Sequence, residues 1–202
     1  MKYHDSIYDM YRTFVTVTES RCPSCSKQNW AWEASHHLFV PSDRDATLAQ
    51  CLDQAANVQS DFTCDHCKTL NKKVNIRYRY QRLPRMLCIQ FSRFDARPGP
   101  NGYSYYKLAH RIEWDLDNFD MSPWLIDGPN KEDARYECIA VIQHTGQSMH
   151  SGHYTAHTRK GTNWWLCNDH KVSRLSPGEV RKEIFDQNDR SVPYLVWFQK
   201  KV

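Results

Sequence analysis

The sequence predicts an α+β protein in which antiparallel strands predominate. Most of the chain consists of short runs rich in β-branched and aromatic residues, and several runs alternate apolar and polar positions as half-buried strands do. One segment has the apolar spacing of an amphipathic helix, and a second could form one or two helical turns. Glycine and proline interrupt the runs, as they do in turns and loops. We therefore expect a mostly β protein with one or two helices.

The first two elements are a strand and a helix. Residues 6–20, SIYDMYRTFVTVTES, have the composition of a strand that runs into the first CxxC pair. Residues 45–59, DATLAQCLDQAANVQ, place their apolar residues on one side of a short helix. Thr47 lies where a residue that caps the helix N-terminus is expected.

Two strands and a loop follow. Residues 73–81, KVNIRYRYQ, alternate cleanly between apolar and polar positions. Residues 86–91, MLCIQF, form a nearly continuous apolar run, which suits a central strand buried on both faces. Residues 96–102, ARPGPNG, are expected to form a loop because glycine and proline break regular structure.

The second half of the chain is predicted to contain four further strands and a short helix. One or two helical turns could form at residues 177–185, PGEVRKEIF, between the last two strands. The strands are expected at 136–144, 153–160, 164–169 and 192–199.

Composition narrows the class of protein. A chain of 202 residues has room for one domain, and 40% hydrophobic and 13% aromatic residues can fill its core. The net charge of +4 is small and scattered, so we expect no nucleic-acid partner. No apolar run approaches the roughly 20 residues of a membrane helix, and the first residues contain no apolar signal region. We therefore expect no membrane partner and an intracellular protein, cytoplasmic or nuclear.

The eight cysteines favour metal ligands and free thiols over a disulfide framework in an intracellular chain. Two CxxC pairs, Cys22 with Cys25 and Cys64 with Cys67, can place four thiolates around one tetrahedral zinc ion. Four thiolates close the coordination shell, so the predicted zinc is structural, one ion per chain. Three histidines are alternative ligands, although we favour surface or packing positions for them: His36, His37 and His66.

A candidate catalytic histidine lies in SGHYTAHTR, residues 151–159, which alternates like a strand. A two-residue loop at 160–161 would pair this strand with WWLCNDHKV and place His153 directly opposite Asn168. A four-residue loop would make the two diagonal but keep them on one face. Asn168 could then fix the imidazole tautomer and leave the other ring nitrogen free to deprotonate a thiol. Gly152 leaves room for another group to approach.

Two other interpretations of this histidine remain open. A histidine paired with asparagine across a hairpin is more often a satisfied polar pair than a catalytic one. A metal site from His150, His153 and His157 is disfavoured because strand geometry separates their side chains.

These motifs, in this order, resemble the ubiquitin-specific protease family of papain-like cysteine peptidases. CPSC and CDHC resemble the family's zinc fingers, and TLAQCL resembles the short helix between them. LPRMLCIQFSRFD, WDLDNFDMSPWL and SVPYLVWFQK resemble three further family segments. YECIAVIQHTG, SGHYTAHTR and WWLCNDHKV resemble its histidine box, and the resemblance covers nearly all of the chain.

The resemblance implies a fold, an activity and roles for site residues. The chain would be a partial catalytic domain over residues 1–202, with zinc-finger-like fingers at 6–82 and a papain-like palm at 83–202. His153 would be the catalytic base, Asn168 the third member of the triad and Asp169 its acidic neighbour. The implied partners are ubiquitin and ubiquitinated proteins, and the implied reaction is hydrolysis of the isopeptide bond at the C-terminus of ubiquitin.

No recognisable nucleophile accompanies this base. The family's cysteine box, which resembles GNTCxxNS, is absent, and we expect the helical thumb that carries it to be lacking. Small core positions are expected for Cys51, Cys88, Cys138 and Cys167. The chain would then be a fragment of a longer enzyme or a truncated, inactive paralogue, and a separate N-terminal half could supply the nucleophile.

Two alternatives belong to other functional classes. The first is a non-catalytic module that binds ubiquitin or a protease partner. The second, more remote, is a zinc-dependent nucleic-acid binder, because basic and aromatic residues interleave around the predicted strand at 73–81. Strict alternation in a half-exposed strand explains that pattern equally well. The residues concerned are Lys72, Lys73, Arg77, Tyr78, Arg79, Tyr80 and Arg82.

Overall fold

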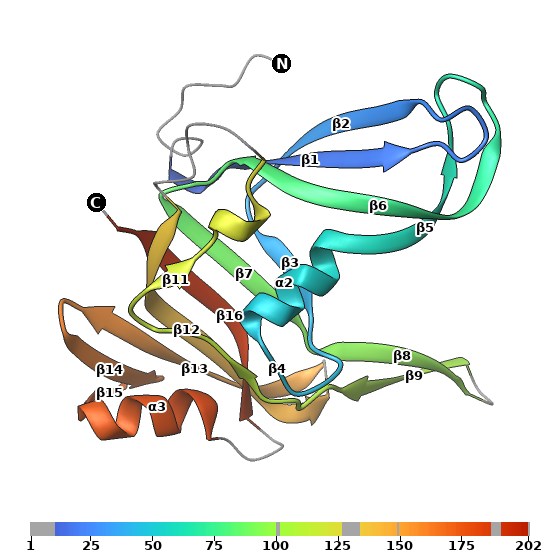
Figure 1. The fold of residues 1–202 in the computed structure, drawn as a ribbon. Helices are drawn as coiled ribbons and strands as arrows, with labels where there is room; N and C mark the ends of the chain where they lie inside the picture. Colours follow the sequence, from blue (N-terminus) through green and yellow to red (C-terminus); the bar gives the residue numbers. More distant parts are fainter. Residues whose placement is uncertain (1–10, 100–101, 127–133, 149, 187–190, 202) are drawn as a thin grey trace.

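The computed structural model describes residues 11–99, 102–126, 134–148, 150–186 and 191–201 (Figure 1). Two antiparallel-rich sheets dominate it, and the smaller sheet projects from the larger one. Among the described residues, no helix is long and apolar enough to cross a membrane. The architecture confirms the predicted α+β class, with antiparallel strands predominating.

The projecting sheet has four strands in the order β2-β1-β6-β5. Alternation explains its longest strand, since Val74 and Tyr80 are buried on one face while Asn75 and Arg77 are exposed on the other. The strand predicted at 6–20 begins only at Phe14, and residues 6–10 lie outside the described part of the chain. The four strands are β1 (Phe14–Arg21), β2 (Gln28–Ser35), β5 (Asn57–Thr63) and β6 (Leu70–Arg82).

The larger sheet has eight strands, and β7 lies in its interior as the apolar run at 86–91 predicts. Seven strands follow the order β15-β14-β13-β12-β16-β7-β3, and β11 pairs with β12 beside this path. The strands are β3 (Leu38–Pro41), β7 (Met86–Ser92), β11 (Phe119–Asp120), β12 (Arg135–Ser148), β13 (Ser151–Lys160), β14 (Asn163–Asn168), β15 (Lys171–Leu175) and β16 (Ser191–Lys200).

Smaller elements complete the described chain. The hairpin of β8 (Phe94–Gly99) and β9 (Gly102–Lys107) extends from the body of the molecule beside the projecting sheet (Figure 1). Of the loop predicted at 96–102, residues 96–99 and 102 therefore lie in strands, with the two glycines at the strand ends, and residues 100–101 lie outside the described part of the chain. Short parallel strands β4 (Ala46–Thr47) and β10 (Ile112–Glu113) pair with each other, and η1 (Ser122–Trp124) is a single 3₁₀ turn.

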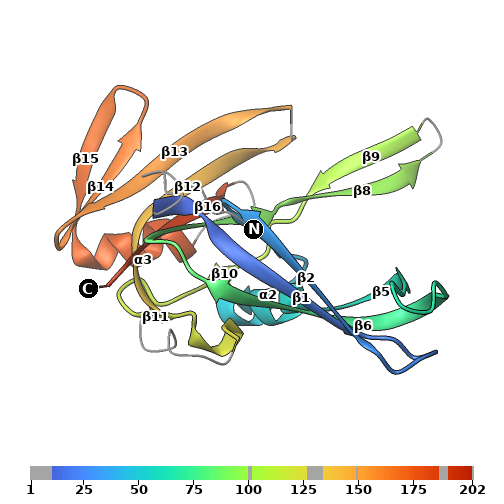
Figure 2. The same ribbon diagram turned by 90° about the horizontal axis from the view of Figure 1, so that it is seen from above.

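Both predicted helices are present and both begin with a capping box. α2 (Leu48–Ala56) is capped by Thr47, whose side chain accepts a hydrogen bond from the backbone of Gln50. α3 (Pro177–Phe185) is capped in the same manner by Ser176 and Glu179. Figures 1 and 2 show both helices on one face of the eight-stranded sheet.

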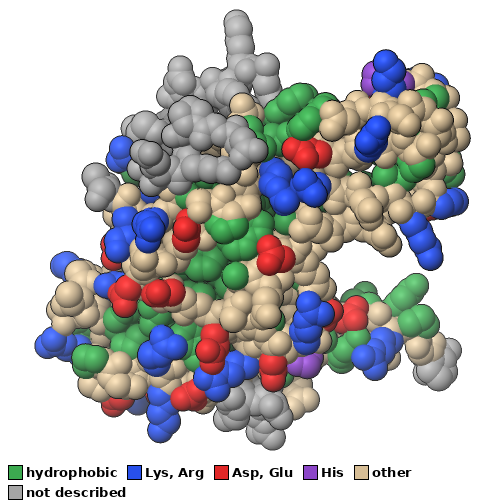
Figure 3. All heavy atoms as spheres, in the orientation of Figure 1, with side chains coloured by type: hydrophobic (Ala, Val, Ile, Leu, Met, Phe, Trp, Pro, Cys, Tyr) green, Lys and Arg blue, Asp and Glu red, His purple; other side chains and the backbone are tan. Residues whose placement is uncertain are grey.

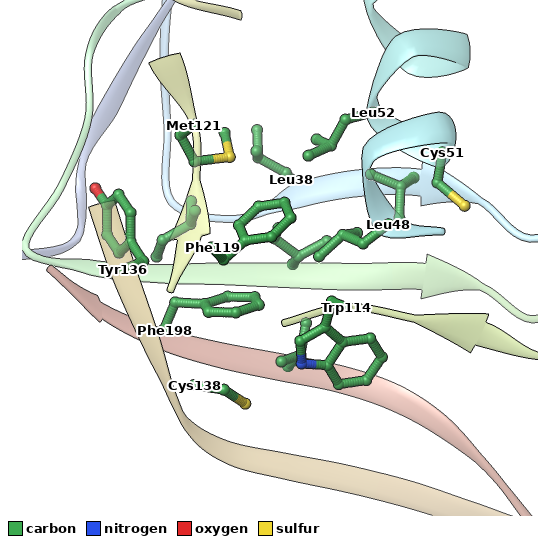
Figure 4. Close-up of a cluster of buried hydrophobic side chains, with 14 of the residues drawn as sticks. Leu38, Leu48, Cys51, Leu52, Trp114, Phe119, Met121, Tyr136, Cys138 and Phe198 are labelled. Carbon is green, nitrogen blue, oxygen red and sulfur yellow. The ribbon is translucent and has the colours of Figure 1, made fainter. Parts of the chain in front are cut away.

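The hydrophobic core fills the space between the helices and the sheet. Leu48 and Leu52 of α2 point toward Phe119 and Phe198 (Figure 4). The rings of Phe119 and Phe198 stack with their centroids 5.2 Å apart. Trp114 joins this core to α3 through an edge contact with Phe185 at 4.8 Å. On the surface shown in Figure 3, basic and acidic side chains are interspersed.

Candidate metal and active sites

The two CxxC pairs form equivalent turns at the tip of the projecting sheet. Cys22 and Cys25 lie in the β1–β2 turn, and Cys64 and Cys67 lie in the β5–β6 turn. In each turn the carbonyl of the first cysteine accepts a hydrogen bond from the residue four positions on. That residue has left-handed backbone in both turns, with φ of 61° at Ser26 and 56° at Lys68.

Four sulfur atoms converge because β1 and β6 are neighbours in the sheet. All four Sγ atoms lie within 4.8 Å of one another. The Sγ atoms of Cys22 and Cys67 are 3.7 Å apart, as are those of Cys25 and Cys64. A tetrahedral zinc with Zn–S bonds of about 2.3 Å requires sulfur separations of about 3.8 Å. The thiol set therefore fits one zinc ion, as predicted from the sequence.

Neighbouring polar groups support this thiolate set. Hydrogen bonds from the side chain and then the backbone of Thr69 lower the pKa of Cys67 to about 6. The buried amide of Asn71 donates to Cys22 Sγ at 3.5 Å and is itself held by Ser24 Oγ at 2.6 Å. Sequence reasoning missed Asn71, because nothing in its position marks it as a residue behind a metal ligand.

The alternative histidine ligands do not join this cluster. Among the described residues, the metal-capable group consists of the four cysteines alone. His36 instead contacts Thr13 through Nδ1 at 3.2 Å, and His37 packs against the Phe39 ring.

His153 and Asn168 meet as predicted, but in a different register. β13 and β14 turn through residues 161–162, so that Lys160 pairs with Asn163 and Ala156 with Cys167. Continued, this ladder places Asn168 diagonal to His153 rather than directly opposite. The direct pairing expected for a loop at 160–161 is therefore wrong, and the diagonal arrangement is the one found, although with a two-residue rather than a four-residue loop. Gly161 has a φ of 60°, and this left-handed conformation moves the turn one residue later than expected.

The diagonal register still brings the two side chains together. His153 Nε2 lies 2.7 Å from Asn168 Oδ1. Because an amide oxygen only accepts, Nε2 carries a proton, and in the neutral ring Nδ1 then has a free lone pair. The imidazole is partly exposed, at 44% of its side-chain surface, so the ring is open to an incoming group.

Asp169 turns back toward the same histidine. Its backbone is left-handed, with a φ of 51°, at the end of β14. This bend brings Oδ2 to 4.0 Å from His153 Nε2, although an ideal strand would direct the side chain to the opposite face. The carboxylate remains 72% exposed, which weakens its electrostatic effect on the imidazole.

Gly152 provides space that a neighbouring side chain already fills. A Cβ atom there would lie 2.2 Å from Nε2 of His144 and 2.6 Å from the carbonyl oxygen of Thr145. The His144 ring is buried, and it packs against the rings of Phe94 and Tyr154. The absence of a side chain at Gly152 thus lets β12 pack closely against the strand that carries His153. Nothing in the sequence indicated that His144 fills this space.

Every cysteine in the chain has a place away from the His153 ring. Burial raises the pKa of Cys51 and Cys88 to about 11, and that of Cys138 to about 12. Cys167 is half-buried rather than in the core as predicted, because α2 and α3 pack on the other face of the sheet. Its Sγ contacts Thr158 at 3.9 Å, on the face opposite Asn168. The other four cysteines form the metal site.

Two further features of the sheet lie apart from the His153 pair. His157 is fully buried, and neither ring nitrogen has a hydrogen-bond partner. A hollow of about 870 Å³ lies between α3 and β14, with Trp164, Leu175 and Val180 in its wall, but neither His153 nor Asn168 lines it. We assign no chemistry to this hollow.

Comparison with known proteins identifies the family. The family model for ubiquitin carboxyl-terminal hydrolase, UCH, matches residues 3–197. The hydrolase cyk-3 of Caenorhabditis elegans is 27% identical over 196 residues, which cover 93% of this chain and 15% of that protein. Ubiquitin carboxyl-terminal hydrolase 3 of Homo sapiens is 31% identical over 123 residues, which cover 60% of this chain and 23% of that protein.

A solved structure shows the same fold. The SAGA Ubp8/Sgf11/Sus1/Sgf73 DUB module bound to ubiquitin aldehyde matches with a TM-score of 0.79 at 22% identity, over 100% of this chain and 44% of the matched chain. The 202 residues therefore span less than half the length of each of these proteins. The match over nearly the whole chain, together with the fold, shows that the chain belongs to the ubiquitin carboxyl-terminal hydrolase family, as its motifs predict.

Proposed function

We propose that this chain supplies the general base and its orienting group to a ubiquitin hydrolase. The observation that supports this most directly is the 2.7 Å contact between His153 Nε2 and Asn168 Oδ1. It fixes one tautomer and leaves Nδ1 free as the base. The substrate would be ubiquitin joined through its C-terminal glycine to a lysine amine.

The proposed chemistry uses the cysteine-peptidase cycle. Nδ1 of His153 takes the proton of a cysteine thiol, and the thiolate attacks the carbonyl carbon of the isopeptide bond. The carbon–nitrogen bond then breaks, and the imidazolium gives its proton to the leaving amine. Water, deprotonated by His153, hydrolyses the thioester and frees the ubiquitin carboxylate and the thiol. Asn168 holds the ring throughout, and Asp169 stabilises the imidazolium.

The nucleophile would come from a separate segment or polypeptide. All eight cysteines of the chain occupy the zinc site, the core or the opposite sheet face. We therefore propose that the 202-residue chain alone forms no acyl intermediate. The partial coverage of longer relatives supports an N-terminal half that carries the thiol, as do the exposed imidazole and its free Nδ1.

The remaining assignments follow from the family and the cysteine chemistry. The projecting sheet with its zinc site corresponds to the proposed fingers, residues 6–82, although β3 and α2 from this range pack with the larger sheet. Residues 83–202 correspond to the proposed palm. Free thiols and a thiolate metal site favour an intracellular location, cytoplasmic or nuclear.

A second candidate is a ubiquitin-binding module without catalysis. This candidate is favoured because the cysteines lie in the metal site, in the core or on the sheet face opposite Asn168. The two candidates differ in one observable property, since only the first predicts that His153 governs thiol reactivity when the missing half is added.

The test is an electrophilic ubiquitin probe that traps an active-site thiol. The chain alone should form no adduct. Addition of a polypeptide that carries a helical, cysteine-bearing half should produce an adduct on the added cysteine, and His153→Ala should abolish it. His37→Ala, which changes an exposed histidine beside Phe39, is the matched control and should leave the adduct intact. An adduct on any of the eight cysteines that is lost in His153→Ala would overturn the proposal. Binding of both ubiquitin and the added half without any adduct would favour the binding module.

A further inference from the structure

Lys107 is a remote side chain that reaches the strand behind His153. It ends β9, far from the histidine box in the sequence. Its ammonium donates to the carbonyl oxygens of His144 at 2.7 Å and Gly146 at 2.8 Å. Burial, and after it the charge of Arg93, lowers the pKa of Lys107 to about 8, as expected for an ammonium held partly out of water.

The two accepting carbonyls flank the residue opposite His153. Thr145, between them, pairs directly with His153 across the β12–β13 ladder. The ladder shifts register between Thr145 and Ser148, and Gly146 has a φ of 135°. On the other side of β12, Thr145 also pairs with Ser191, the first described residue of β16. Lys107 therefore donates to carbonyls at the point where the pairing of β12 with β13 becomes irregular.

The same hairpin base also holds the side chain of His144. Phe94 pairs with Lys107 across the hairpin, and its ring meets the His144 ring edge-on at 5.7 Å. His144 in turn occupies the space that Gly152 leaves beside His153. The hairpin base thus contacts both the backbone and the ring of the residue that packs behind the proposed base.

The hairpin base is itself fixed to the sheet. Arg93, which precedes β8 and is 1% exposed, donates through Nε to the carbonyl of Pro193 at 2.8 Å. Its Nη1 donates to the carbonyl of His110 at 2.6 Å, beyond the end of β9. A hydrogen bond from Leu108 N to Arg93 O closes the base. Lys107 therefore extends from a hairpin base that hydrogen bonds fix to the larger sheet.

We propose that Lys107 is a positioning residue for His153. By holding the carbonyls of His144 and Gly146, it keeps the end of β12 where Thr145 faces His153 and the His144 ring supports Gly152. His153 then stays within reach of Asn168, and its Nδ1 keeps one direction. This inference rests on the proposed function, since it assigns Lys107 to the orientation of the proposed base.

The experiment compares Lys107→Met, which removes the donors at similar length, with Lys107→Arg, which retains them. Ring ¹⁵N shifts of His153, assigned with His153→Gln, report its tautomer, and amide exchange reports opening at Gly152 and His153. In Lys107→Met both tautomers of His153 should be populated. Amide exchange at Gly152 and His153 should become about tenfold faster, which corresponds to a loss of about 1.4 kcal/mol of local stability. Lys107→Arg should restore the wild-type pattern. Lys160→Met, an exposed lysine at the far end of β13, should change neither readout.

The outcomes separate this inference from the function on which it rests. A wild-type His153 without a fixed tautomer would count against the proposed base. The role of Lys107 would then be tested only by amide exchange at Gly152 and His153. A fixed tautomer and slow exchange that persist in Lys107→Met would overturn the positioning role. If Lys107→Met fails to fold, the ammonium ¹⁵N signal of wild-type Lys107 is measured instead. Ammonium protons that exchange slowly at Lys107 but rapidly at Lys160 would support the positioning role. Rapid exchange at Lys107 would overturn it.

Discussion

The side chains of His153 and Asn168 meet on one face of a twisted hairpin, with Nε2 and Oδ1 2.7 Å apart, although the two residues are not cross-strand partners. The diagonal arrangement lets the amide approach the ring from one side. The contact engages Nε2, so the other ring nitrogen, Nδ1, remains for the proposed thiol.

We predict that Asn168→Ala releases the His153 ring without unfolding the chain. The amide lies at the exposed end of β14, so its removal leaves no buried group unsatisfied. Ring ¹⁵N spectra should change from one tautomer to an exchanging pair. Asn163→Ala, at the other end of the same strand, serves as the control and should leave the His153 signals unchanged. A single tautomer in Asn168→Ala would mean that another group orients the imidazole.

We predict that the purified chain contains about one zinc ion, and that Cys64→Ser releases it. Without the metal, three thiolates at the tip of the projecting sheet repel one another and the sheet loosens. Elemental analysis checks the metal content, and amide exchange in β1 and β6 checks the loosening. Cys167→Ser should retain the zinc, because this thiol contacts Thr158 instead. A metal-free wild-type chain with a fully ordered tip would contradict the prediction.

We predict that Gly152→Ala destabilises the chain by about 1–3 kcal/mol, the usual cost of overpacking. The added methyl would lie 2.2 Å from His144 Nε2 and 2.6 Å from a backbone oxygen, so both strands must shift. Urea denaturation measures the loss. In a double-mutant cycle, His144→Ala should recover only part of it, because the clash with the Thr145 carbonyl remains. Full additivity of the two changes would show that His144 does not fill the space beside Gly152.

We predict that His157 makes the fold sensitive to acid. Burial lowers its pKa from 6.5 to about 4, so between these values the unfolded chain binds the proton and the folded chain does not. Stability therefore falls as the pH falls from 6.5 to 4. The difference corresponds to about 3 kcal/mol, at about 1.4 kcal/mol for each pKa unit.

His157→Leu removes both the unsatisfied nitrogens and this titration. The variant should be more stable than the wild type near pH 7 and should lose less stability at about pH 4.5, as measured by urea denaturation. His37→Leu, at an exposed position, should keep the acid sensitivity of the wild type. An equal acid loss in wild type and His157→Leu would assign the effect to other groups.

The sequence predicted those features that depend on local pattern. Alternation and apolar runs located β6 and β7, and Thr47 marked the start of α2 because a cap is a local hydrogen bond. Parity alone placed His153 and Asn168 on one face, since a shift of two residues does not change the face. The same argument could not choose the register, which depends on the backbone of Gly161.

Features that arise from packing between distant segments were not predictable. β3 is four residues long and pairs in parallel with β7, so its pattern is too short to distinguish it from a loop. Lys107 gives no signal in the sequence, because its partners are backbone carbonyls that any residue supplies. Cys167 was expected in the core because cysteines are usually buried, but it lies on the sheet face opposite α2 and α3.

The placement of one CxxC pair in each of two hairpins has a consequence for the order of folding. Each hairpin can form locally, but each holds only half of the sulfur ligands. The halves meet only after β1 pairs with β6, where Ser20 lies opposite Ile76. Such pairing between distant segments is slow because it requires a large loop to close first. Binding of the metal by all four cysteines should therefore occur late in folding. The rate of this binding should equal the rate at which the projecting sheet is completed.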